Sequence, residues 1–159
     1  MTADFTHLDS AGNARMVDVT AKQPTVRSAT AKGRVTIAPE TVSALRDGSV
    51  PKGDVLAVAR IAGIQGAKKC AELLPLAHII GVHGAVVDLE ITDEGVEISA
   101  TIRTADRTGV EMEALTAVTV AGLAIVDMVK GMDRSAAMTD MRIVAKSGGR
   151  SGSWAREGE

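Results

Sequence analysis

Aromatic side chains are almost absent from this chain of 159 residues, which contains one Phe, one Trp and no Tyr. Because proteins that bind single-stranded nucleic acids commonly stack bases on aromatic rings, this scarcity disfavours that class of function. A formal net charge of −2 also argues against a general nucleic-acid surface. We therefore predict no nucleic-acid partner, and we expect any anionic ligand to be bound by a local cluster of cations.

Cysteine is nearly absent too. The single Cys70 cannot form an intramolecular disulfide, which is typical of a reducing compartment, and its apolar helical context predicts a buried thiol. The chain has no uninterrupted run of about 18 apolar residues of the kind that spans a bilayer. Its first residues lack the basic start and apolar segment of a signal peptide. These absences predict a cytoplasmic protein with no membrane partner.

Signatures of metal and nucleotide sites are missing as well. The sequence has no HxH, HExxH or paired-cysteine spacing, so we predict no metal ligands. The glycine-rich segment Lys-Ser-Gly-Gly-Arg-Ser-Gly, residues 146–152, lacks the spacing of a P-loop. Its two cations and small residues still suit an anion, because backbone amides can approach closely there. A flexible tail is the competing interpretation.

The hydrophobic pattern predicts an α+β protein with an antiparallel sheet covered by helices on one face. Residues 1–14 are polar and aperiodic, which predicts a mobile arm, and 148–159 predict a flexible tail; the domain between them is 15–147. Strands are expected at 16–20, 25–37, 82–92, 96–103 and 138–145, and helices at 39–47, 54–74 and 110–132.

Small residues mark one stripe of the helix expected over 54–74. Gly63 and Gly66 lower helix propensity, so their presence indicates that another element packs closely against this helix. A sheet or a partner helix would both account for the stripe.

Two carboxylates stand at the start of the helix expected over 110–132. Thr108 followed three residues later by Glu111 is the pattern of a capping box, which would satisfy amides at the helix start. The box does not account for Glu113. That residue either complements the positive end of the helix dipole or belongs to a site.

Asp127 and Lys130 share a face near the other end of the same helix. A surface ion pair is one interpretation. The apolar residues around Asp127 favour the other, a partly buried acid–base pair. Glu113 and Asp127 are 14 residues apart, or about 21 Å along a helix, so one small substrate cannot reach both in one chain. If both are functional, the site is composite and the protein is an oligomer.

Two further residues are candidates on their own context. Lys52 follows Pro51 and precedes Gly53 in a turn before a helix, where it is either a solvated lysine or an anion contact. His78 lies in an apolar stretch after Pro75 and is either a satisfied core histidine or a phosphate contact or proton carrier.

Six segments together resemble the family of molybdenum cofactor biosynthesis protein C, the cyclic pyranopterin monophosphate synthases, in the same order from about residue 5 to 154. They are MVDVTAK (16–22), KGDV (52–55), ARIAGIQGAK (59–68), TGVEMEALT (108–116), DMVK (127–130) and AKSGGRSG (145–152).

The resemblance implies a ferredoxin-like α+β fold and a homohexamer, a trimer of dimers with sites between subunits. It implies a lyase that converts (8S)-3′,8-cyclo-7,8-dihydroguanosine 5′-triphosphate to cyclic pyranopterin monophosphate and releases pyrophosphate. No cofactor is evident, and Mg²⁺ could accompany the triphosphate.

Carried over by motif, the catalytic residues would be Lys52, Asp127 and Lys130. The lysines would neutralise the triphosphate while Asp127 and a lysine move protons. The substrate pocket would be lined by Arg27, His78, Glu111, Met112, Glu113 and Lys146.

One loop departs from the family. Where the family often has Pro-Leu-Cys-His-Pro-Leu, this chain has Ala77 in place of the cysteine and Ile79 in place of the second proline. A cysteine nucleophile at position 77 is therefore excluded, and the orientation of His78 is less constrained. The alternative to the enzyme is a non-catalytic paralogue that keeps the same scaffold for binding or assembly.

Overall fold

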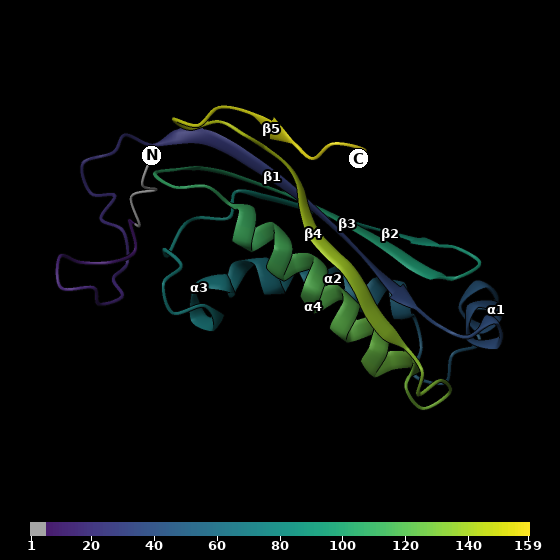
Figure 1. The fold of residues 1–159 in the computed structure, drawn as a ribbon. Coiled ribbons are helices and arrows are strands. Elements are labelled where there is room, and N and C mark those ends of the chain that lie inside the picture. Colours follow the sequence, from purple (N-terminus) through teal and green to yellow (C-terminus); the bar gives the residue numbers. More distant parts are fainter. Residues whose placement is uncertain (1–5) are drawn as a thin grey trace.

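Five antiparallel strands form an open sheet in the order β2-β3-β1-β4-β5 in the computed structural model, which describes residues 6–159 (Figure 1). The strands are β1 (Thr25–Thr36), β2 (Gly84–Ile91), β3 (Gly95–Asp106), β4 (Ala137–Ser147) and β5 (Trp154–Ala155). The helices are α1 (Pro39–Asp47), α2 (Val55–Lys68), α3 (Cys70–Leu73) and α4 (Glu111–Val129).

The two long helices α2 and α4 lie side by side on one face of this sheet (Figure 1). Helices connect β1 to β2 and β3 to β4, and the four main strands follow the order β2-β3-β1-β4. This arrangement confirms the predicted α+β class and is the ferredoxin-like one. This fold places both ends of α4 at the rims of the sheet, where loops from distant parts of the sequence contact the helix.

The core lies between the sheet and the helices. Alternate residues of β3, among them Val96, Ile98 and Ile102, are buried against it. A Cβ at Gly63 would lie 3.0 Å from the Ala117 carbonyl oxygen, and one at Gly66 would lie 2.8 Å from the Val120 side chain. The predicted close approach to α2 is therefore confirmed, and the packing partner is α4.

Local signals account for most element boundaries. Pro39 opens α1, and Gly48 ends it in the left-handed conformation with a φ of 66°. The Asp54 side chain accepts a hydrogen bond from the Ala57 amide at 2.9 Å and caps α2. Gly53 precedes that cap with a φ of 104°, so the turn that carries Lys52 requires a glycine.

Three sequence-based predictions of local structure are wrong. Residues 16–20 form no strand, because they run beside the α3–β2 segment instead of joining the sheet. The helix expected over 54–74 is divided at Lys69 into α2 and α3. The capping box at Thr108 does not form, since α4 begins at Glu111 after Val110 with no side-chain cap.

The predicted division into arm, domain and tail stays a prediction, and residues 1–5 of the arm lie outside the described residues. Within the expected tail, Trp154–Ala155 pairs with β4 as β5. The Glu159 side chain then forms ion pairs with Lys32 of β1 and Arg142 of β4. These contacts lay the tail against the sheet.

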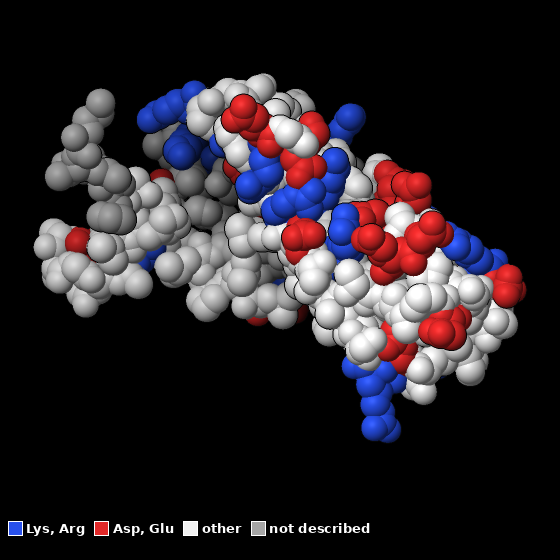
Figure 2. All heavy atoms as spheres, turned by 45° about the vertical axis from the view of Figure 1, so that its right-hand side comes forward, with Lys and Arg blue, Asp and Glu red and all other residues white. Residues whose placement is uncertain are grey.

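Helix α4 is long and apolar enough to cross a membrane by length and composition alone. Half of it is buried inside the domain, however, and core helices of soluble proteins commonly meet the same criterion. Acidic and basic side chains intermingle on the molecular face in Figure 2, in keeping with the nearly balanced composition.

Candidate active site

The residues predicted for the site gather in two groups, one at each end of α4. Lys52, Asp127 and Lys130 meet at its C-terminal end. The other group surrounds its N-terminal end, more than a dozen residues away along the helix. The structure of one chain therefore brings each group together but keeps the two groups apart.

At the C-terminal end, two lysines converge on one carboxylate. Lys130 Nζ lies 2.6 Å from Asp127 Oδ1, and Lys52 Nζ lies 3.5 Å from Asp127 Oδ2. Lys52 Nζ also donates a hydrogen bond to the Asp127 backbone carbonyl at 2.8 Å. Cations placed there satisfy and complement the negative end of the helix. We call these three residues the lysine–aspartate cluster.

The lysine–aspartate cluster is open to solvent in the single chain. The exposed fractions of the side chains are 47% for Lys52, 57% for Asp127 and 58% for Lys130. The predicted partial burial of Asp127 is therefore wrong, because Asp127 lies on the outer side of the helix together with the exposed Leu123, whereas Ile125, Met128 and Val129 face the core. Lys130, and then Lys52, hold the pKa of Asp127 below its usual value, so the carboxylate is ionised at neutral pH.

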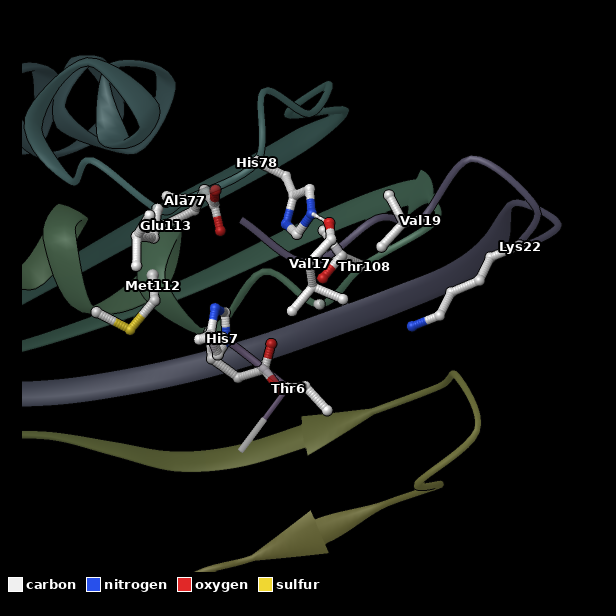
Figure 3. A pocket seen from close by; sticks show the side chains of 13 residues that line it. Thr6, His7, Val17, Val19, Lys22, Ala77, His78, Thr108, Met112 and Glu113 are labelled. Atoms are coloured by element: carbon white, nitrogen blue, oxygen red, sulfur yellow. Dashed lines mark hydrogen bonds between the residues drawn. The ribbon is translucent and has the colours of Figure 1, made fainter. Parts of the chain in front are cut away.

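At the N-terminal end, a cavity of about 450 Å³ opens between α4, the α3–β2 segment and the chain before β1. Figure 3 shows its wall, with Met112 and Glu113 on one side, Val19 and Lys22 on the other, and His78 next to Val17 between them. A volume of this size suits a small-molecule ligand. Of the predicted pocket residues, His78, Glu111, Met112 and Glu113 line this cavity. We call it the α4 cavity.

Glu113 is the most enclosed charged group of the α4 cavity, with an exposed fraction of 4%. Burial raises the pKa of its carboxyl group, and nearby Glu111 adds to that increase. The backbone of Glu113, the nearby Cys70 side chain and His78 act in the opposite direction. The net pKa is raised, so Glu113 takes up a proton more readily than an exposed glutamate.

His78 fastens the chain before β1 to the cavity wall. Its Nε2 lies 2.5 Å from the Val17 carbonyl oxygen, the contact drawn as a dashed line in Figure 3. A carbonyl oxygen only accepts hydrogen bonds, so Nε2 carries the proton. His78 is half-buried and hydrogen-bonded, and its other ring nitrogen is left for a ligand or solvent.

Lys146 connects the start of α4 to β4. Its Nζ lies 3.2 Å from Glu111 Oε1 and donates to Ser151 Oγ at 2.6 Å. Glu111 thus points back towards β4 rather than capping its own helix. A Cβ at Gly109 would overlap the Glu111 carboxylate, so a larger residue there would displace the Glu111 side chain from this position.

Arg27 lines a second, basic cavity of about 750 Å³ next to the first. Its Nε donates to the Asp106 carbonyl at 3.2 Å, which fixes the guanidinium at the end of β3. Lys22 and Arg150 also line this space, and Lys22 lines the α4 cavity as well. A Cβ at Gly149, whose φ is 75°, would overlap the Arg27 guanidinium.

Lys22 was not among the predicted site residues. Its only signal in the sequence is its place at the end of the segment MVDVTAK, because no periodicity marks the irregular chain before β1. Within residues 6–159, no three His, Cys, Asp or Glu side chains cluster closely enough to hold a metal ion.

The profile of the MoaC family matches residues 16–149, which include both groups of site residues. The chain belongs to the MoaC family. Its similarity to individual members extends over nearly the whole sequence, and the family predicted from the six ordered segments is confirmed.

Relatives from several bacterial genera carry the name cyclic pyranopterin monophosphate synthase. The Streptomyces coelicolor protein is 59% identical over 152 residues, which cover 96% of this chain and 89% of the relative. The Nocardioides protein is 55% identical over 155 residues, and the Chloroflexus aurantiacus protein is 52% identical over 155 residues. Each of these two alignments covers 96% of this chain and 95% of the relative.

Proposed function

We propose that this member of the MoaC family is a cyclic pyranopterin monophosphate synthase of molybdenum cofactor biosynthesis. The synthase names of relatives at 52–59% identity support the predicted enzyme class. Following the family resemblance, the enzyme is a lyase. Its substrate is (8S)-3′,8-cyclo-7,8-dihydroguanosine 5′-triphosphate, and its products are cyclic pyranopterin monophosphate and pyrophosphate.

The observation that carries this proposal is the lysine–aspartate cluster. Lys52 and Asp127 are 75 residues apart in sequence, yet Lys52 Nζ lies 2.8 Å from the Asp127 carbonyl oxygen. Two cations on one ionised carboxylate can accept a polyanionic substrate, because each lysine can exchange its contact with Asp127 for a phosphate oxygen. Positive charge placed where pyrophosphate leaves stabilises the negative charge that develops on the leaving oxygen.

In this proposal the groups at the two ends of α4 have different roles in the reaction. The α4 cavity offers Glu113, with its raised pKa, and His78 to the nitrogen-rich base of the substrate. Arg27, Lys22 and Lys146 extend from it as cations for phosphate oxygens. The lysine–aspartate cluster supplies the remaining charges, and Asp127, ionised at neutral pH, accepts protons as the purine ring opens.

We further propose that the complete site forms between subunits of a homohexamer, a trimer of dimers. Glu113 and Asp127 are separated by about 21 Å of helix within one chain. If both act on one small substrate, a second chain brings a lysine–aspartate cluster to each α4 cavity. Such a contact would also enclose the exposed lysines and strengthen their interaction with phosphate, since water would be excluded.

Two further expectations accompany the enzyme. A triphosphate is usually bound as a complex with Mg²⁺, and the phosphates themselves can supply most of its ligands. The proposal includes no other cofactor. It also retains the prediction of a cytoplasmic location.

The direct experiment incubates the purified protein with the cyclised triphosphate and measures pyrophosphate and pterin product, with and without Mg²⁺. We expect turnover by the unmodified chain. The same experiment tests the alternative that this chain is a non-catalytic paralogue. The altered loop is the reason to consider it: the family often has proline where this chain has Ile79, which is 93% exposed. Substrate binding and normal assembly without turnover would contradict the enzyme and favour the non-catalytic paralogue.

A further inference from the structure

The segment between α3 and β2 carries His78 to the wall of the α4 cavity without regular secondary structure over residues 77–83. No proline in this range restricts the backbone, and Ile79 is 93% exposed. Ile80 and Val82 pack against the core. Apolar packing leaves the backbone polar groups of the segment without partners, so the contacts that these groups make show what fixes it.

Gly81 is held to the end of β3 by two side chains. The Thr104 hydroxyl donates a hydrogen bond to the Gly81 carbonyl oxygen at 2.6 Å, and the Gly81 amide donates to Asp106 Oδ2 at 3.3 Å. Thr104 is only 2% exposed, so its hydroxyl has little water to bind instead. Both backbone polar groups of Gly81 are therefore satisfied by side chains of one strand.

His83 fastens the same segment to β3 two residues further along the chain. Its Nδ1 accepts a hydrogen bond from the Ala105 amide at 3.1 Å and lies 3.3 Å from Thr104 Oγ1. The Thr104 hydroxyl gives its one proton to the Gly81 carbonyl, so Nδ1 is an acceptor and a neutral ring carries its proton on Nε2. We call the side chains of His83, Thr104 and Asp106 the β3 latch.

His78 lies between two fixed points of the chain. On one side the Ala77 amide donates to the Leu74 carbonyl oxygen at 3.1 Å. On the other side the β3 latch holds Gly81, three residues after His78. From this position His78 Nε2 reaches the Val17 carbonyl oxygen at 2.5 Å. A shift of Gly81 would therefore move His78 and weaken its contact with the chain before β1.

We propose that Thr104 is a positioning residue, which fixes the α3–β2 segment through the β3 latch and so orients His78 at the wall of the α4 cavity. Because the proposed function assigns His78 to the substrate cavity, the role of Thr104 in turnover rests on that function. The orientation of His78 is a property of the folded protein and can be tested without substrate.

The alternative is that Thr104 only satisfies its own buried hydroxyl, since buried polar groups are nearly always hydrogen-bonded. Thr104→Val would then lower stability without moving His78. Thr101→Val is the matched control, because it makes the same exchange on the same strand. Thr101 lies on the other face of β3, where its Oγ1 is 2.8 Å from Thr30 Oγ1. Each variant loses a hydrogen bond, but only Thr104→Val opens the β3 latch.

The first test needs no substrate and follows the imidazole nitrogens by NMR spectroscopy. The chain has three histidines, so the signals of His78 and His83 can be assigned by replacing each one. At pH 8 we expect both rings to carry their proton on Nε2. In Thr104→Val the Nε2 proton of His78 should exchange with water about tenfold faster, because the loosened segment opens more often. Thr104→Ser should restore slow exchange, and Thr101→Val should keep it.

A His78 signal and exchange rate that are the same in Thr104→Val as in the unmodified chain would overturn the proposal. If Thr104→Val does not fold, Asp106→Ala takes its place. This variant removes the other hydrogen bond to Gly81, and Asp106 lies outside the core. Faster exchange of the His78 proton in Asp106→Ala would support the latch, and unchanged exchange would overturn it.

The second test measures kcat/KM. In Thr104→Val we expect a fall of about 10- to 100-fold, the order that misplacement of a group in the site commonly costs. Thr104→Ser should restore most of the activity, and Thr101→Val should retain it. Unchanged kcat/KM in a folded Thr104→Val variant would overturn the role in turnover. If the unmodified protein has no turnover, the proposed function fails, while the exchange of the His78 proton still decides whether Thr104 positions this ring.

Discussion

The two ends of α4 offer opposite environments on one helix. At the N-terminal end Glu113 is 4% exposed and its pKa is raised by burial. At the C-terminal end Asp127 is 57% exposed and its pKa is lowered by two lysines. A carboxyl group is thus made ready to hold a proton at one end and kept ionised at the other.

This difference indicates which part of the proposed site is already enclosed within a single chain. The α4 cavity already has walls from α4, the α3–β2 segment and the chain before β1. The lysine–aspartate cluster has its charges in contact but no cover. Exposed ion pairs contribute little to stability, so stability alone does not account for this cluster, and the proposed substrate contact assigns it another role. The experiments below change one end of α4, or the packing that holds both ends in place, and measure the effect on activity or stability.

The largest expected effect is the loss of activity in Lys52→Ala. Removing one positioned charge from a transition state commonly costs about 10²–10³-fold in turnover, and we expect a loss of that order. Because Lys52 is exposed, the unfolding temperature should hardly change. Lys32→Ala, which also removes a partly exposed lysine with an ion-pair partner, is the matched control and should retain activity.

Next in size is the effect of Gly66→Ala on stability. The added Cβ would meet Val120 at 2.8 Å and force α2 away from α4, at a cost of about 1–3 kcal/mol in the free energy of unfolding. Denaturant unfolding measures this cost. Since α2 and α4 hold both ends of the site in place, turnover should fall with stability; unchanged stability would contradict the close helix packing.

A smaller effect of opposite sign is expected for Glu113→Gln. A glutamate whose folded pKa is raised destabilises the protein as pH rises from the unfolded pKa, about 4.3, through the folded value. The neutral variant should therefore be more stable at pH 7, by an amount on the order of 1 kcal/mol, and the difference should vanish in acid. Thermal unfolding across this pH range measures it; equal stability at pH 7 would argue against an enclosed carboxyl group.

The smallest effect overall is expected for Lys146→Met. Its pair with Glu111 is partly exposed, so we expect a loss below about 1 kcal/mol in the free energy of unfolding. If Lys146 contacts the substrate, KM should rise while the fold is unchanged. A KM equal to that of the unmodified protein would remove Lys146 from the substrate pocket.

Elements with strong local signals could be predicted from the sequence. Pro39 and Gly48 mark the ends of α1, and the glycines of α2 correctly indicated a close partner. The exposure of Asp127 was harder to predict. The apolar residues that flank it in sequence lie around the whole circumference of the helix, so they do not determine which side of the helix faces the core. The break at Lys69 has no sequence signal that we recognise.

The site was only partly predictable. The distance between Glu113 and Asp127 follows from helical rise alone. The contact between Lys52 and Asp127 joins segments 75 residues apart, and no periodicity encodes it; the family resemblance grouped these residues. Lys22 lies in irregular chain, where spacing carries no information about the direction of a side chain. The hydrogen bond of His78 to Val17 likewise depends on tertiary structure.

The central claim is that one active site uses the two ends of α4 from different chains, and complementation tests it most directly. Glu113→Gln and Asp127→Asn are each expected to be inactive, and random mixing leaves some interfaces with an intact α4 cavity and an intact lysine–aspartate cluster. We predict that oligomers assembled from both variants regain part of the pyrophosphate release. Mixed oligomers that form but show no more activity than the two variants alone would contradict a site shared between chains.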